Sequence, residues 1–246
     1  MPTEPRMQAY TDLKERWNIP RLGNLTYSQR REIHRKMLEI NRAVPASDRP
    51  HYLSHIYYFM DAILSVPIGF EGCIVEAGCF KGISSARFSH IAKLTRRRFV
   101  IFDSFEGLPE NDEKHEKSIM GHSIEGWFTK GKYAGSLEEV KRNISRYGYA
   151  EPCEFRKGWL ENMLPHFRLP VAAAYIDVDL ASSTKTCLQN LYSLLSPGGA
   201  IVSQDGDFPL VINVFKEWLA SFDPKTQSMP RIEGLGISKM VKIVKP

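Results

Sequence analysis

Short apolar runs alternate with segments of helical spacing along most of the chain. Six runs have the length and composition of β-strands: Cys73–Ala77, Phe99–Phe102, Cys153–Phe155, Val171–Ile176, Ala200–Ser203 and Ser238–Val244. Strands that alternate with helices predict βαβ units and a mostly parallel sheet. The runs are apolar rather than alternating, which is typical of strands covered by helices on both faces. The pattern therefore predicts an α/β fold.

The segments between these runs predict the helices. Their apolar residues recur at helical spacing over Thr26–Val44, His51–Val66, Ile83–Lys93, Ser136–Tyr147, Ser183–Leu195 and Leu210–Ala220. Two of these helices precede the first strand. We therefore expect residues 1–70 to form an N-terminal arm and helical cap, with the arm over residues 1–24, and residues 71–246 to form the sheet domain. A length of 246 residues suits one α/β domain with such an extension.

Composition excludes several classes of protein. The net charge of +5 is scattered, and the one dense basic run, Arg96–Arg98, lacks the interleaved aromatic residues of a nucleic-acid surface. The four cysteines are widely spaced without a CxxC pair, so we expect reduced thiols and a cytoplasmic protein. No signal peptide is visible in the polar residues 1–17, and no apolar run is long enough to span a membrane. We expect neither nucleic acid nor a membrane as a partner.

Chemistry-bearing residues follow the predicted strands. Ligands of parallel sheets bind beyond the carboxyl ends of the strands. The residues at these ends are Glu76 and Gly78, Asp103, Gly158 and Trp159, Asp177, and Gln204 and Asp205. Four of the five ends carry a carboxylate, and this concentration predicts a site.

The first strand ends in a glycine loop, and the second ends at Asp103. Gly78 and Gly82 let the backbone pass close beneath a ligand, and the free amides of the following helix can bind a carboxylate. The GxxxG spacing differs from the GxGxxG of dinucleotide binders, which favours an amino-acid-like ligand over a pyrophosphate. Asp103 is placed to accept hydrogen bonds from ribose hydroxyls. A tight turn at the glycines and an Asx-turn or helix cap at Asp103 are the structural alternatives.

The fourth and fifth strands end in Asp177-Val178-Asp179 and Asp205-Gly206-Asp207. Carboxylates on neighbouring strand ends suit a hard divalent cation. Asp177 and Asp179 face opposite ways on extended backbone, so we expect only Asp177 to point into the site. For Asp179 and Asp207 the favoured interpretation is a helix N-cap.

A long segment, residues 109–135, has the length of a lid or functional loop. Its aromatic residues Trp127, Phe128 and Tyr133 could cover an apolar substrate or pack the loop down. His122 lies in the same segment and is a candidate catalytic base.

Six motifs in one order resemble the macrocin O-methyltransferase family, which methylates sugar hydroxyls of macrolides and related natural products. They are Ile74–Gly82, Asp103–Pro109 (DSFEGLP), Ser136–Val140, Gly158-Trp159, Asp177–Leu180 and Leu195–Gly199. The resemblance covers roughly residues 70–220. It implies a Rossmann-like methyltransferase fold with a seven-stranded, mostly parallel sheet, helices on both faces and an N-terminal helical cap.

The resemblance also implies roles for individual residues. The residues it places at S-adenosylmethionine are Glu76, Gly78, Cys79, Lys81, Gly82 and Ser84 around the methionine portion, Asp103, Ser104 and Phe105 at the ribose and adenine, Ser136, Gly158 and Trp159 around the adenine, and Asp177. Mg²⁺ would be held by Asp177 and by the pair Gln204 and Asp205. Gln204 replaces an acidic residue of the family, so metal independence is an open alternative.

The expected reaction is transfer of a methyl group from S-adenosylmethionine to a hydroxyl of a small-molecule acceptor, with Asp177, Asp205 and His122 as candidate catalytic residues. Two other readings stay open. Asp177-Val178-Asp179 could be the DxD motif of a metal-dependent glycosyltransferase, which leaves the glycine loop unexplained. The chain could also bind the cofactor without catalysis, a reading that Gln204 supports. Whether it forms a homo-oligomer is open as well.

Overall fold

The computed structural model describes residues 19–23, 25–67 and 69–246. The arm expected over residues 1–24 lies almost entirely outside these ranges. Within them, no helix has both the length and the apolar character needed to cross a membrane.

Seven strands in the described part of the chain form one sheet in the order β3-β2-β1-β4-β5-β7-β6. Their bounds are Cys73–Ala77 (β1), Phe99–Asp103 (β2), Cys153–Lys157 (β3), Val171–Ile176 (β4), Leu195–Ser203 (β5), Arg231–Glu233 (β6) and Val241–Val244 (β7). Strands β1 to β5 pair in parallel, whereas β7 runs antiparallel to both β5 and β6. The chain moves outward from β1 to β3 and returns to the other side for β4. The ends of β1 and β4 therefore flank the switch point at which such sheets bind ligands.

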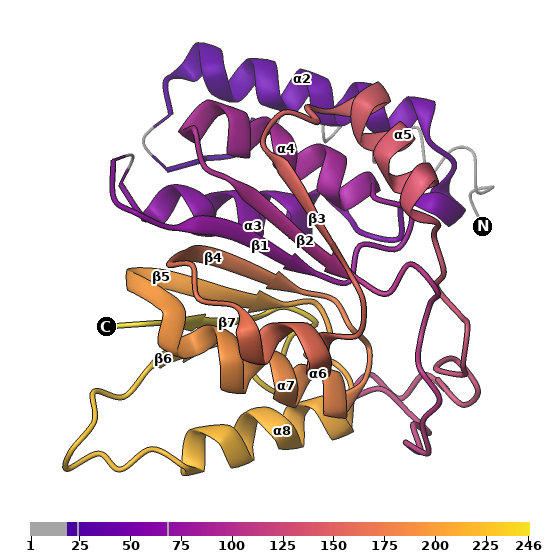
Figure 1. Ribbon diagram of the computed structural model, residues 1–246, viewed down its shortest axis with the longest axis vertical. Coiled ribbons are helices and arrows are strands. Elements are labelled where there is room, and N and C mark those ends of the chain that lie inside the picture. The colour runs from indigo at the N-terminus through magenta and orange to yellow at the C-terminus, as the bar shows by residue number, and fades with distance from the viewer. Residues whose placement is uncertain (1–18, 24, 68) are drawn as a thin grey trace, which may run out of the picture.

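Helices cover both faces of this sheet (Figure 1). One face carries α2 (Tyr27–Ala43), α3 (Leu53–Ser65), α4 (Ile83–Thr95) and α5 (Leu137–Tyr147). The other carries α6 (Leu160–Met163), α7 (Ala181–Leu191) and α8 (Pro209–Ala220). Thr26 and Ser136 begin α2 and α5 as N-caps, since each side chain accepts a hydrogen bond from a first-turn amide.

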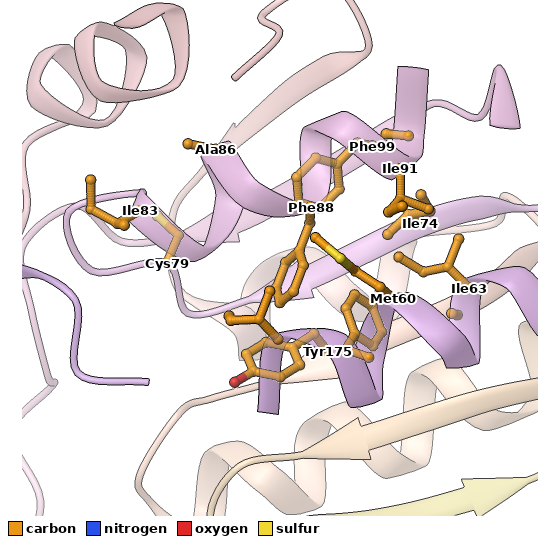
Figure 2. Packing of buried hydrophobic residues seen from close by; sticks show 14 of the residues in the cluster. Met60, Ile63, Ile74, Cys79, Ile83, Ala86, Phe88, Ile91, Phe99 and Tyr175 are labelled. Atoms are coloured by element: carbon orange, nitrogen blue, oxygen red, sulfur yellow. The ribbon is translucent and has the colours of Figure 1, made fainter. Parts of the chain in front are cut away.

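The two faces bury two separate apolar cores because successive side chains of each strand point to opposite sides. Ile74 packs with α2 to α5, and its neighbour Val75 packs with α7 and α8. Figure 2 shows the first core, where Phe88 of α4 stands over Tyr175 of β4 with the ring centroids 5.0 Å apart. Helices α2 and α3 thus share one core with the sheet.

The predicted α/β fold is confirmed, and the differences concern one missed strand and the bounds of two others. Strand β6 was not predicted, because Arg231-Ile232-Glu233 offers a single apolar residue and pairs only with β7. Strand β5 begins at Leu195 rather than Ala200, because Leu195 already pairs with β4. An irregularity in the pairing, which includes Gly198 and Gly199, separates this first pair from the pairs that start at Ala200. The last strand is shorter than predicted and begins at Val241.

Candidate functional site

A cleft lies beyond the carboxyl ends of β1 to β5. Seven of the residues expected from the sequence line it: Gly78, Asp103, Ser104, Gly158, Trp159, Asp177 and Asp205. The fold therefore brings residues from five strand ends, up to 127 positions apart in the chain (78 to 205), to one surface.

The loop of residues 78–82 after β1, called the glycine turn below, begins with a glycine because two backbone segments approach each other closely there. Gly78 has φ +81°, and a Cβ atom there would lie 1.9 Å from the carbonyl oxygen of Asp177. The amide of Asp177 in turn donates to the carbonyl of Ala77 (3.0 Å). Only glycine allows the ends of β1 and β4 to meet this closely at a left-handed residue.

Asp103 is bound to this turn by its carboxylate. One oxygen accepts a hydrogen bond from the amide of Cys79 and the other from the amide of Phe105, both at 2.7 Å. Burial raises the pKa of Asp103, while these two amides oppose that rise. The carboxylate is thereby held at a set position on the cleft wall.

Three carboxylates from the ends of β4 and β5 form an acidic cluster: Asp177, Asp179 and Asp205 each place an oxygen within 4.8 Å of the others. One Asp205 oxygen accepts hydrogen bonds from the amides of Val178 and Asp179, both at 3.1 Å. Burial and the charge of Asp177 raise the pKa of Asp205 to about 8. Burial and the other two carboxylates raise that of Asp179 well above its usual range. Mutual repulsion of this kind favours a bound cation, and three oxygen donors are a set that Mg²⁺ accepts.

Two expectations about these aspartates are wrong. Asp179 does not point away from Asp177, because its left-handed backbone (φ +62°) breaks the alternation of an extended chain and turns its carboxylate into the cleft. It is also not a helix cap, since Leu180 occupies that position in α7 and makes no capping bond. Asp207 is no cap either: Phe208 precedes α8. Among the described residues nothing hydrogen-bonds to the buried Oδ1 of Asp207.

Gln204 lies apart from the acidic cluster. Its side-chain oxygen accepts a hydrogen bond from the hydroxyl of Tyr175 (3.0 Å), and its nitrogen lies 3.1 Å from Nδ1 of His55. Consecutive residues of a strand end face opposite sides of the sheet, so Gln204 and Asp205 cannot both face the cleft. In the structure Asp179 takes the place beside Asp177 and Asp205 that we had expected for Gln204.

The long segment 109–135 closes one side of the cleft with Trp127, Phe128 and Tyr133. It is fastened by Glu113, whose carboxylate accepts hydrogen bonds from the amides of Ala181 (2.7 Å) and Ser182 (2.9 Å) at the start of α7. Burial disfavours the Glu113 charge, but these bonds and one from His115 outweigh it and lower its pKa to about 2. A carboxylate at a helix N-terminus is further stabilised by the helix dipole.

His122 belongs to the same segment but is exposed and does not line the cleft. Its carbonyl pairs with the amide of Ser118 in a small hairpin.

Several residues expected at the cofactor also lie outside the cleft walls. They are Glu76, Cys79, Lys81, Gly82, Ser84, Phe105 and Ser136. Glu76 is fully buried and accepts a hydrogen bond from Ser85 (2.5 Å), and burial raises its pKa to about 8. Lys81 pairs instead with Asp48 of the N-terminal region (2.8 Å).

His51 is a cleft residue that the sequence did not reveal. Its Nε2 lies 2.8 Å from an Asp177 oxygen, and its Nδ1 is buried without a hydrogen-bond partner among the described residues. The one available signal was its place at the start of the aromatic helix expected over 51–66. Lys239, near the start of β7, also lines the cleft, and its charge partly opposes the rise in the pKa of Asp179 and Asp205.

Two curated O-methyltransferases are similar to this chain. The chain is 32% identical over 163 residues to the 8-demethyl-8-(2,3-dimethoxy-α-L-rhamnosyl)-tetracenomycin-C 4′-O-methyltransferase of Streptomyces olivaceus, a match that covers 62% of this chain and 59% of that protein. It is 30% identical over 158 residues to the demethyldecarbamoylnovobiocin O-methyltransferase of Streptomyces niveus, covering 62% of this chain and 60% of that protein. These matches thus span about three fifths of the curated relatives.

A solved structure shares the fold. The O-methyltransferase NovP aligns with a TM-score of 0.62 and 24% identity, over 78% of this chain and 80% of its own. Residues 52–230 match the model of the family described as macrocin O-methyltransferase (TylF), a span that includes every motif on which the resemblance was based. The chain therefore belongs to the macrocin O-methyltransferase family.

Proposed function

We propose that this protein is an S-adenosylmethionine-dependent O-methyltransferase acting on a hydroxyl, expected on a sugar, of a small-molecule natural product. The observation that carries the proposal is that one cleft is lined both by Asp103, bound to the glycine turn, and by the acidic cluster at the ends of β4 and β5. Family membership and two relatives named as O-methyltransferases support the same reaction class.

The residues of the cleft fit this methyl donor. Asp103 offers carboxylate lone pairs to ribose hydroxyls beside the glycine turn. Acidic residues outnumber basic ones among the residues that line the cleft, an excess that favours a positively charged sulfonium: the acidic ones are Asp103, Glu161, Asp177, Asp179 and Asp205, and the lysine is Lys239. The glycine turn lacks the Gly-Lys-Ser/Thr sequence of a phosphate-binding loop.

The chain's main contribution to this reaction is alignment. S-adenosylmethionine, when bound, supplies a methyl group on a positively charged sulfur. The acceptor oxygen forms a bond to that carbon as the carbon–sulfur bond breaks, and the hydroxyl proton passes to a base. The products are a methyl ether and S-adenosylhomocysteine. Holding two reactants in line can lower the barrier by about 7–11 kcal/mol.

Asp177 and His51 are the groups placed to take the proton. Asp177 lies on the cleft wall, and Nε2 of His51, 2.8 Å from one of its oxygens, orients the carboxylate. The acidic cluster of Asp177, Asp179 and Asp205 would hold Mg²⁺, which lowers the pKa of a hydroxyl near it. This assignment replaces Gln204 by Asp179 and removes His122 from the reaction.

Binding of S-adenosylhomocysteine measured by calorimetry tests the proposal. Asp103→Asn should weaken binding at least tenfold, whereas Asp112→Asn, an exposed aspartate outside the cleft, should leave it unchanged. UDP-glucose serves as the competing ligand. Tighter binding of UDP-glucose than of S-adenosylhomocysteine would overturn the proposal in favour of a glycosyltransferase.

A methylation assay tests whether the protein catalyses the proposed reaction. The wild-type protein with S-adenosylmethionine should methylate 8-demethyl-8-(2,3-dimethoxy-α-L-rhamnosyl)-tetracenomycin C or demethyldecarbamoylnovobiocin, detected as a mass increase of the acceptor. Binding of S-adenosylhomocysteine without methylation of either acceptor would contradict the catalytic part of the proposal.

A further inference from the structure

Residues 131–135 are fixed to both loops that follow β1 and β2. At one end, the amide of Gly131 donates to the carbonyl of Leu108, and the amide of Leu108 donates to the carbonyl of Lys132, both at 2.9 Å. At the other end, Gly135 packs so closely on the glycine turn that a Cβ atom would lie 2.1 Å from the carbonyl oxygen of Phe80. The middle of this segment is therefore held at a set position relative to the proposed methyl donor.

Tyr133 occupies that middle position in a left-handed backbone conformation that residues other than glycine rarely adopt. Its φ is +58°, and Phe80, which faces it from the glycine turn, has φ +49°. The two rings meet edge to face, with centroids 6.4 Å apart and planes at 83°. Strained backbone of this kind persists where the surroundings hold it, and it clusters at ligand-binding sites.

The Tyr133 side chain lines the cleft and is 42% exposed there. Burial, together with the charges of Asp179 and Asp177, raises the pKa of its hydroxyl. The acidic cluster, where the reaction is proposed, lines the same cleft as Tyr133 and its hydroxyl. Within residues 19–23, 25–67 and 69–246, no group hydrogen-bonds to it.

We propose that Tyr133 binds the methyl acceptor, its ring packing against the acceptor and its hydroxyl hydrogen-bonding to an acceptor oxygen next to the one that is methylated. This inference rests on the proposed function. It makes Tyr133 a residue that determines which hydroxyl reaches the methyl group, because the segment that carries it cannot shift independently of the glycine turn.

The test compares Tyr133→Phe, which removes only the hydroxyl, with Tyr133→Gly, which removes the ring and tolerates the left-handed backbone. Tyr149→Phe is the matched control, a similarly exposed tyrosine (39%) that lies outside the cleft against Lys93. The acceptor is whichever of the two natural products named above the wild-type protein methylates. Steady-state kinetics gives KM and kcat/KM for the acceptor, and calorimetry gives the affinity for S-adenosylhomocysteine.

Loss of the hydroxyl should lower kcat/KM for the acceptor about tenfold, mainly through KM, and loss of the ring should lower it further. The affinity for S-adenosylhomocysteine should change less than twofold in every variant. Wild-type kcat/KM in Tyr133→Phe and Tyr133→Gly would overturn the inference while leaving the proposed function intact. A tenfold loss of S-adenosylhomocysteine affinity in both variants would instead assign Tyr133 to the methyl donor. Failure of the wild-type protein to methylate either acceptor would overturn the proposed function and this inference with it.

Discussion

Nε2 of His51 lies 2.8 Å from a carboxylate oxygen of Asp177, which joins the segment before α3 to the end of β4. His51 is only 9% exposed and also meets the ring of Tyr175 edge to face, with centroids 6.1 Å apart. The N-terminal region therefore supplies part of the cleft wall. Asp177 and His51, the two groups proposed to take the proton, thus come from opposite sides of the first strand, and His51 precedes that strand by more than twenty positions (51 to 73).

Replacing His51 should impair catalysis more than cofactor binding. His51→Ala leaves Asp177 without its partner, and we expect kcat to fall at least tenfold while the affinity for S-adenosylhomocysteine changes little. His34→Ala is the control, because His34 is also buried and hydrogen-bonds to Tyr57 (2.7 Å) away from the cleft. Equal kcat in the two variants would contradict the role of His51.

The acidic cluster predicts which substitutions should remove the effect of Mg²⁺ on the melting temperature. Wild-type protein should melt several degrees higher with Mg²⁺, because the ion binds the folded cluster and relieves its repulsion. Asp179→Asn should abolish most of that rise in Tm. Gln204→Ala, which removes an amide outside the cluster, should retain it, as should Asp207→Asn. Loss of the response in Gln204→Ala alone would restore Gln204 as the ligand.

The close approach at Gly78 predicts a large loss of stability for Gly78→Ala. The new Cβ would overlap the carbonyl oxygen of Asp177, so the free energy of unfolding should fall by more than about 3 kcal/mol. Gly198→Ala is the matched control: its φ is +75°, but nothing lies within 4 Å of a new Cβ. It should cost only about 1–2 kcal/mol of backbone strain. Urea unfolding measures both, and equal losses would show that backbone strain alone explains Gly78.

Glu113 predicts a dependence of stability on pH. Because its pKa is about 2 in the folded protein and 4.5 ordinarily, its stabilisation is complete above pH 4.5 and is lost as the pH falls towards 2. Glu113→Gln should lower the free energy of unfolding at pH 7 by about 1–2 kcal/mol after allowance for solvent screening.

The difference between wild type and Glu113→Gln should shrink between pH 4.5 and 3. Glu110→Gln is the control, since Glu110 pairs with Lys130 at the surface and is 80% exposed. A difference that stays constant down to pH 3 would show that the charge of Glu113 does not fasten the loop.

Much of this architecture could be predicted from the chain because it depends on local patterns. Runs such as Val171–Ile176 are apolar at every position, and only a strand buried on both faces explains that. Thr26 and Ser136 precede their helices as caps, so their boundaries were predictable to one residue. The edge strand Arg231–Glu233 escaped prediction because none of its residues is fully buried, so it lacks an apolar run. The division of the chain at residue 70 stays a prediction.

The candidate site divides in the same way. Gly78, Asp103, Asp177 and Asp205 could be predicted because each follows a recognisable strand, and parallel strands bring their carboxyl ends to one edge. Their assembly in one cleft is now visible, while their roles toward cofactor and metal stay proposals.

The tertiary structure alone decided the remaining members. Asp179 joins the acidic cluster through a left-handed backbone angle that no residue pattern announces. Gln204 turns away because its strand has no room for two adjacent side chains on one face, and Tyr175 and His55 satisfy its amide there. His51 stands at the start of a predicted helix and Tyr133 in a long loop, and their places depend on long-range contacts with Asp177 and Phe80. The sequence thus determined which strand ends meet, because local burial patterns encode the strands. Backbone turns and contacts between distant segments decided which side chains line the cleft.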